Sequence, residues 1–100
     1  MTGDNEAARP VHILLVEDSP GDARLTLEVL KQSKLHVNLA VVKDGVEGLD
    51  YLCRQGAYAD ASRPDLILLD LNLPRLDGRE LLARIKTNAE LCDIPVVILT

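Results

Sequence analysis

Three carboxylates stand directly after two apolar runs of this chain. Glu17 and Asp18 follow residues 13–16, and Asp70 follows residues 66–69. A short apolar run without polar alternation is typical of a strand buried on both faces of a parallel sheet. Open α/β sheets keep their ligand sites at the carboxyl ends of such strands. We therefore expect Glu17, Asp18 and Asp70 to converge in one crevice at the carboxyl edge of a sheet.

Carboxylates in one crevice need a compensating positive charge or protons. Two like charges ~4 Å apart repel by about 4 kcal/mol at an effective dielectric constant of ~20. Mg2+ suits such a set because it takes hard oxygen ligands, few of them from the protein, and keeps several waters. Alternatively, the three acids only cap helices, but Ser19, Asp44 and Asp77 already occupy the cap positions. The pattern therefore favours a magnesium site.

The elements that must position these acids alternate along the chain. Strands are predicted at residues 11–16, 35–42, 65–70 and 96–100, the second being an edge strand with one wet face. Helices are predicted to begin after Ser19, Asp44 and Asp77, the first ending near Lys34 and the second by Gly56. Their expected apolar faces are Ala23, Leu27 and Leu30; Val46, Leu49, Leu52 and Cys53; and Leu82, Ile85 and Ala89. Right-handed crossovers then build a parallel sheet with helices on both faces, and we expect an α/β fold, a doubly wound sheet of strand order 2-1-3-4.

Length and composition restrict the class of protein. One hundred residues allow one small domain, which we place at residues 11–100 after a disordered tail at residues 1–10. The formal net charge of −5 disfavours nucleic acid and anionic membranes as partners. No apolar stretch approaches the ~20 residues that span a bilayer, and no signal peptide is recognisable, so we expect a cytoplasmic protein. Cys53 and Cys92 are interpreted as reduced structural thiols.

Four stretches of the chain carry a family resemblance. They are ILLVED at residues 13–18, DLILLD at 65–70, LPRLDG at 73–78 and IPVVILT at 94–100. In sequence and spacing they resemble the receiver domain of two-component response regulators, whose fold is flavodoxin-like. The loop at residues 70–78 and the stand-alone length look most like the small regulators that are paired with bacterial phytochrome kinases.

The resemblance implies a role for each matching residue. Asp70 would be the phospho-acceptor, and Thr100 the switch hydroxyl that turns toward the phosphoryl group. Asp18 and Asp70 would bind Mg2+ directly, Glu17 through water, and Asn72 through its backbone carbonyl. The implied partner is a sensor histidine kinase, in the narrower resemblance a bacterial phytochrome. The domain would catalyse only its own phosphorylation and dephosphorylation, so it is not expected to be an enzyme acting on other substrates. This agrees with the chemistry, because a carboxylate is a feasible nucleophile toward phosphorus and Mg2+ neutralises the phosphoryl oxygens.

The chain departs from the family pattern at its carboxyl end. Receivers continue through a further helix, a fifth strand and a fifth helix, and the fifth strand brings a lysine that pairs with the phosphate. No residue here matches that lysine, since Lys86 falls on the third predicted helix. We therefore expect a truncated receiver whose natural protein is longer. Without the missing segment, the strand at residues 96–100 would be an exposed apolar edge, which favours aggregation or a homodimer, and phosphorylation would be poor.

Three other functions compete with this interpretation. A haloacid-dehalogenase-type phosphatase also uses an Asp at a strand end, but Asn72 stands where its general acid should be. A nucleotide-binding module needs a glycine-rich first loop, whereas residues 17–22 are acidic and would repel phosphates. A receiver fold used only for docking, without phosphorylation, would not need the complete acid set. A phosphatase assay with a chromogenic ester distinguishes the first of these, and a metal titration distinguishes the last.

Overall fold

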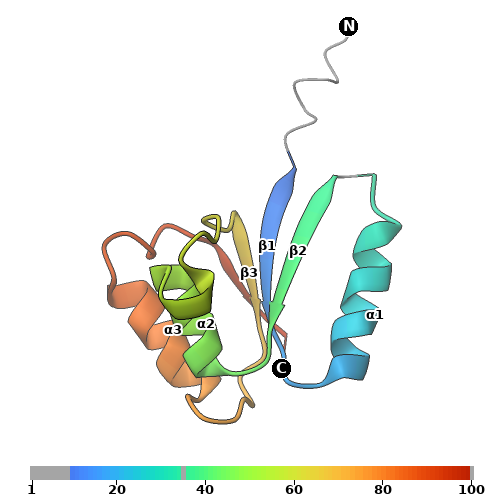
Figure 1. Cartoon of the computed structure of the whole chain (residues 1–100). Helices are drawn as coiled ribbons and strands as arrows, with labels where there is room; N and C mark the ends of the chain where they lie inside the picture. Colours follow the sequence, from blue (N-terminus) through green and yellow to red (C-terminus); the bar gives the residue numbers. More distant parts are fainter. Residues whose placement is uncertain (1–9, 35, 100) are drawn as a thin grey trace, which may run out of the picture.

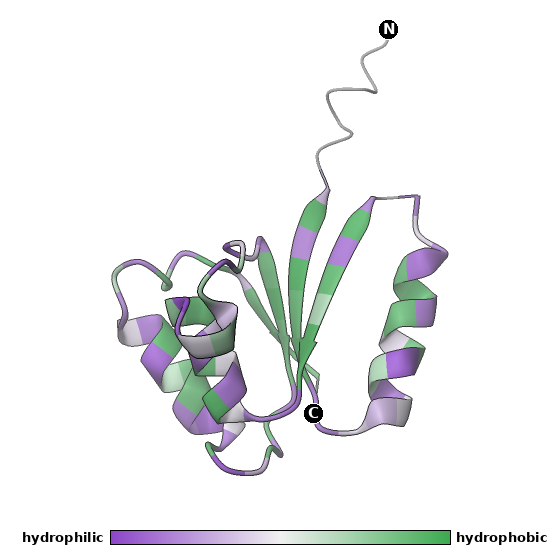
Figure 2. Ribbon diagram, in the orientation of Figure 1, coloured by the Kyte–Doolittle hydropathy of each residue, from purple (hydrophilic) through white to green (hydrophobic). Residues whose placement is uncertain are grey.

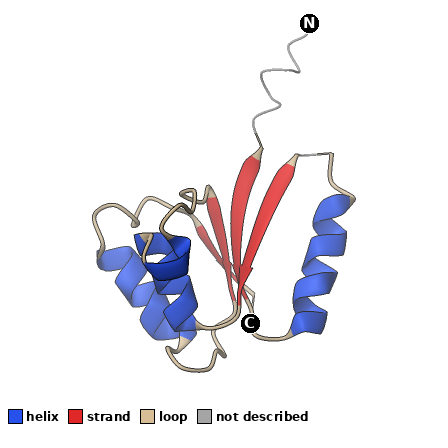
Figure 3. Cartoon of the chain, viewed as in Figure 1, coloured by secondary structure: helices blue, strands red, loops and turns tan. Residues whose placement is uncertain are grey.

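The computed structural model describes residues 10–34 and 36–99, which form a four-stranded parallel sheet with three α-helices (Figures 1 and 3). The elements in chain order are β1 (Val11–Val16), α1 (Pro20–Lys31), β2 (Val37–Val42), α2 (Gly45–Cys53), the 3-10 helix η2 (Gly56–Tyr58), β3 (Leu66–Leu69), α3 (Gly78–Thr87) and β4 (Val96–Ile98). The strand order is β2-β1-β3-β4, and α1 covers one face of the sheet while α2 and α3 cover the other (Figure 1). The predicted doubly wound fold is therefore confirmed. Residues 1–9 of the tail predicted at residues 1–10, residue 35 and residue 100 lie outside the described residues.

The hydrophobic core lies between the sheet and the pair α2 and α3. The parallel register aligns Leu14 with Ile67 and Val16 with Leu69, and all four side chains are fully buried. Figure 2 shows that the strands are hydrophobic along most of their length, whereas the helices alternate between hydrophobic and hydrophilic residues. The opposite face is less well covered, because α1 has no fully buried residue. Packing on both faces of β1, the central strand that carries Glu17 and Asp18, therefore fixes where those acids emerge.

The predicted apolar face of the third helix is confirmed at Ile85 and wrong at Ala89, and Leu81 rather than Leu82 is its fully buried leucine. The buried side chains of α3 are Leu81 and Ile85, whereas Leu82 is only half-buried and Ala89 is exposed. Ala89 cannot share that face because α3 ends at Thr87 and Asn88 adopts an extended conformation. Since Leu81 and Leu82 are adjacent, both fit a helical period, and packing in the core, where Leu81 lies against Gly48 of α2, selects Leu81.

The interpretation of the two cysteines as structural is also corrected. Both thiols are free, but Cys53 and Cys92 are exposed. Cys53 is the last residue of α2, and the following Arg54 turns into the left-handed conformation that ends the helix. The buried positions of α2 are Gly45, Gly48 and Leu52, and of the two glycines Gly45 faces Leu76 of the β3–α3 loop while Gly48 faces Leu81 of α3.

β1 has its predicted bounds, whereas β2, β3 and β4 are slightly shorter than predicted, and β3 ends at Leu69, immediately before Asp70. The second strand is at an edge of the sheet, as expected, and its Val42 is buried in the core. Within residues 10–34 and 36–99, none of the helices has the length and apolar character needed to cross a membrane.

Candidate metal centre

The carboxylates of Glu17, Asp18 and Asp70 come together at the carboxyl edge of the sheet. One oxygen from each lies within 4.8 Å of the oxygens of the other two. This follows from the parallel ladder, which continues past the strand ends. The N–H of Glu17 donates to the carbonyl of Val42 at 2.9 Å, and the N–H of Asp70 donates to the carbonyl of Val16 at 3.1 Å. The three acids therefore leave the sheet in adjacent positions.

Burial makes this cluster electrostatically costly without a cation. Glu17 is 7% exposed and Asp70 is 8% exposed, whereas Asp18 is open to solvent. Desolvation raises the pKa of Glu17 above its ordinary value, and the nearby charge of Asp70 raises it further. The N–H of Ser19, 3.3 Å from the Glu17 carboxylate, opposes this by lowering the pKa. Three clustered carboxylates, two of them buried and one accessible, fit a hard divalent cation that keeps part of its water shell.

Backbone hydrogen bonds hold the loop that follows Asp70. Oδ1 of Asp70 accepts the N–H of Asn72 at 2.9 Å, and the N–H of Gly78 donates to the carbonyl of Leu71 at 3.2 Å. Gly78 is required here because a Cβ at this position would lie 2.6 Å from the carbonyl oxygen of Asp70. Asn72 is thus next to the acid cluster, as the sequence led us to expect, and the role of its carbonyl as a ligand stays a prediction.

Thr100 lies outside the described residues, so its role as a switch hydroxyl also stays a prediction. The preceding residue, Leu99, has a defined backbone position, because its N–H donates to the carbonyl of Leu69 at 2.8 Å. The chain therefore runs beside β3 up to the residue that precedes Asp70.

The predicted helix caps are present. Ser19 Oγ accepts the N–H of Asp22 at 3.3 Å, Asp44 Oδ1 accepts that of Glu47 at 2.8 Å, and Asp77 Oδ1 accepts that of Arg79 at 2.7 Å. The capping of all three helices is thus accounted for without Glu17, Asp18 or Asp70.

Sequence reasoning missed two basic residues near this edge. A cavity of about 270 Å³ beside the cluster is lined by Glu17, Asp18 and Lys43, among others, so a positive charge borders the crevice. Arg75 forms an ion pair with the buried Asp44. Lys43 could have been noticed because it directly follows a strand of the same sheet. Arg75 had no signal in the local pattern, since its partner is distant in sequence.

Comparisons with known proteins agree with this geometry. The family model described as the response regulator receiver domain matches residues 13–100. The chain is similar to response regulator Rcp1 from Synechocystis sp., with 53% identity over 96 residues that cover 96% of this chain and 65% of Rcp1. It therefore spans slightly less than two thirds of that curated relative.

Solved structures give the same result. The Mn(2+)-bound form of Rcp1 superimposes with a TM-score of 0.89 at 55% identity, covering 91% of this chain and 66% of that one. The phosphorylated cyanobacterial phytochrome response regulator RcpA superimposes with a TM-score of 0.85 at 53% identity, covering 89% of this chain and 64% of that one. From the matched family model, the shared fold and the acid cluster, we conclude that the chain belongs to the response regulator receiver domain family of two-component systems.

Proposed function

We propose that residues 11–100 form a receiver domain that accepts a phosphoryl group on Asp70 from a sensor histidine kinase. The observation that carries this proposal is the convergence of Glu17, Asp18 and Asp70 at the carboxyl ends of β1 and β3, with Asp70 buried among them. Family membership supports it, as does the similarity to RcpA, whose solved structure is of the phosphorylated protein.

In the proposed transfer, a carboxylate oxygen of Asp70 attacks the phosphorus of a phosphohistidine on the kinase. The O–P bond of an acyl phosphate forms as the P–N bond breaks, and the released imidazole takes up a proton. The N–H of Asn72, which donates to Asp70 Oδ1, orients the carboxylate before the attack. Because Asp70 is buried, bulk water has limited access to its carboxylate.

In this proposal Mg2+ is bound directly by Asp18 and Asp70, through water by Glu17, and by the backbone carbonyl of Asn72. When bound, the cation would neutralise charge on the phosphoryl oxygens. The similarity to a receiver whose structure is described as Mn(2+)-bound supports a divalent cation at this cluster. Thr100 is proposed as the hydroxyl that would turn toward the phosphoryl group and switch the surface.

The partner proposed here is a histidine kinase of the bacterial phytochrome type. The support is that RcpA, 53% identical over the superimposed region, is described as a phytochrome response regulator. A cytoplasmic location is part of the proposal, because the phosphoryl group of such kinases derives from cytoplasmic ATP. The match of residues 13–100 to the receiver domain family argues against a haloacid-dehalogenase-type phosphatase, and Asn72 cannot serve as its general acid.

The proposal is tested by phosphotransfer to the full-length protein. A radiolabelled, autophosphorylated histidine kinase should pass its label to the wild-type protein in the presence of Mg2+, and the label should be lost in alkali, as for an acyl phosphate. Asp70→Asn should accept no label, whereas Asp60→Asn, which removes the same charge from an exposed loop, should accept it at the wild-type rate. Labelling of Asp70→Asn at the wild-type rate would place the acceptor elsewhere. A wild-type protein that accepts no label and shows no Mg2+ binding in a metal titration would instead indicate a docking role.

A further inference from the structure

Arg75 adopts a backbone conformation that its surroundings must hold in place. It lies in the loop between β3 and α3 and has a φ of 65°, in the left-handed region that L side chains rarely occupy. Among the described residues, Arg54 is the other non-glycine residue with a positive φ, and it ends α2 as a left-handed cap. Arg75 ends no helix. A non-glycine residue persists in this region only where its neighbours compensate for the strain.

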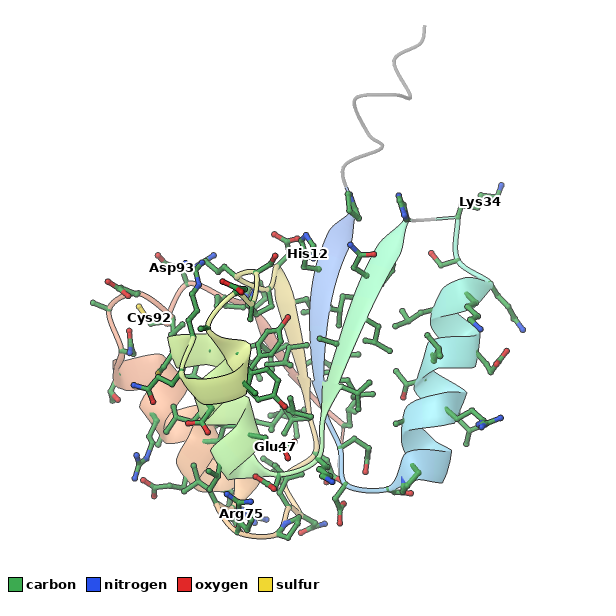
Figure 4. The ribbon with its side chains drawn as sticks, in the orientation of Figure 1. His12, Lys34, Glu47, Arg75, Cys92 and Asp93 are labelled. Carbon is green, nitrogen blue, oxygen red and sulfur yellow. The ribbon has the colours of Figure 1, made fainter. Side chains whose placement is uncertain are left out.

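The side chain of Arg75 reaches the start of α2. Its Nη1 lies 3.5 Å from Oδ2 of Asp44, and the Asp44 side chain is 6% exposed whereas that of Arg75 is 59% exposed. The other oxygen of Asp44, Oδ1, accepts the N–H of Glu47 and caps α2. Figure 4 shows Arg75 on the β3–α3 loop, at the same end of the molecule as Glu47. Since one partner is buried, this pair is screened less by solvent than the exposed pairs on the surface.

Leu76, which follows Arg75 in the loop, packs on Gly45, which follows Asp44 and is the first residue of α2. A Cβ built on Gly45 would clash with the carbonyl oxygen of Leu76 and lie 2.7 Å from its Cβ, so the two backbones are in direct contact. Leu76 is also partly buried against the core. The loop is therefore attached to α2 by two successive residues, one through charge and one through packing.

The same loop is attached at both of its ends to Asp70. The N–H of Asn72 donates to Oδ1 of Asp70 at 2.9 Å. At the other end, Gly78 packs on the carbonyl of Asp70 and donates its N–H to Leu71. A displacement of the loop at Arg75 would thus be transmitted to the hydrogen bond that orients the Asp70 carboxylate.

We propose that Arg75 is a positioning residue for Asp70: its ion pair with Asp44 holds the 71–77 loop on α2, and that loop sets the orientation of Asn72 and of the Asp70 carboxylate. This inference rests on the proposed role of Asp70 as the phospho-acceptor. Arg75 acts through the loop and does not contact the phosphoryl group.

The test compares four variants of the full-length protein. Arg75→Ala removes the charge, Arg75→Gly removes both the charge and the backbone strain, and Arg75→Lys keeps a positive charge. Arg79→Ala is the matched control, because Arg79 pairs at 3.8 Å with Asp77 and both of those side chains are exposed. Two quantities are measured: the rate at which acetyl phosphate labels Asp70 at saturating Mg2+, and the amide chemical shifts of Asn72 in the presence of a chelator.

Arg75→Ala and Arg75→Gly should lower the labelling rate by about tenfold or more, since small displacements of a reacting group have effects of this size. Both should also shift the Asn72 amide resonance, and Arg75→Lys should restore the rate and the resonance, while Arg79→Ala changes neither. A wild-type labelling rate in Arg75→Ala or Arg75→Gly would overturn the inference. So would a slow Arg75→Ala protein whose Asn72 resonance is unchanged, because its defect would lie elsewhere. If the wild type is not labelled at all, the proposed function fails, and the Asn72 resonance alone still decides whether Arg75 positions the loop.

Discussion

Replacing Asp70 with Asn should stabilise the metal-free protein. The Glu17 and Asp70 oxygens lie within 4.8 Å of each other, and both residues are less than a tenth exposed. At that separation and an effective dielectric constant of ~20, their repulsion is about 3.5 kcal/mol. Asn at position 70 removes the charge and keeps an oxygen that can accept the N–H of Asn72, although exchanging a charge-assisted hydrogen bond for a neutral one costs about 1 kcal/mol. The free energy of unfolding should therefore rise by about 1–3 kcal/mol.

The assay is urea unfolding of the full-length protein followed by circular dichroism at neutral pH, with a chelator and then with Mg2+. With a typical slope of about 1–3 kcal/mol per M urea, the Asp70→Asn midpoint should rise by about 1 M in chelator. The gain should shrink in Mg2+, because the cation stabilises the wild type and not the variant. Asp60→Asn removes the same charge from an exposed site and should stay within about 0.5 kcal/mol of the wild type.

Two results would refute this reasoning. One is a metal-free Asp70→Asn protein that is no more stable than the wild type, which would mean that the carboxylates do not repel one another in the fold. The other is an equal gain in Asp60→Asn, which would attribute the effect to net charge rather than to the cluster.

Three further predictions follow from the same geometry. Because the pKa of Glu17 is raised by burial and by Asp70, its contribution to stability is complete below the ordinary value of 4.5 and is lost as pH rises through the raised pKa. Urea unfolding against pH in chelator should therefore show a smaller decline in Glu17→Gln than in the wild type, and equal slopes would contradict the shift. Asp18→Asn should weaken Mg2+ binding by about tenfold or more in calorimetry, since it removes a direct ligand, and unchanged affinity would exclude Asp18 from the site. A polypeptide of residues 1–100 alone should associate through β4, because Val97 in that strand is 46% exposed. Light scattering that shows a compact monomer, together with normal labelling of Asp70, would argue against this association.

The strands and the acids at their ends could be predicted from sequence because both are local patterns, and the general rules for doubly wound sheets then gave the strand order. Each apolar run is long enough to be a strand, and Glu17, Asp18 and Asp70 stand at the ends of two of them. Parallel pairing of β1 and β3 then brings the carboxyl ends of the two strands together, so the acids that follow them lie in one site.

The predictions were wrong at positions where the local sequence allows more than one side chain to face the core and tertiary packing selects one of them. Leu81 and Leu82 both fit a helical period, and only packing in the core, where Leu81 lies against Gly48 of α2, selects Leu81. Cys53 fits the apolar face of α2 by spacing, but the helix ends there and the thiol becomes exposed. The Arg75–Asp44 pair could not be found at all, because it depends on how the β3–α3 loop returns to α2.

The most direct test of the central claim is to locate the phosphoryl group in the full-length protein. After treatment with acetyl phosphate and Mg2+, reduction of the acyl phosphate followed by mass spectrometry of peptides should mark Asp70 alone, and a chelator should suppress the modification. Modification at another carboxylate, or equal modification of Asp70 in chelator and in Mg2+, would contradict a metal-assisted acceptor formed by Glu17, Asp18 and Asp70.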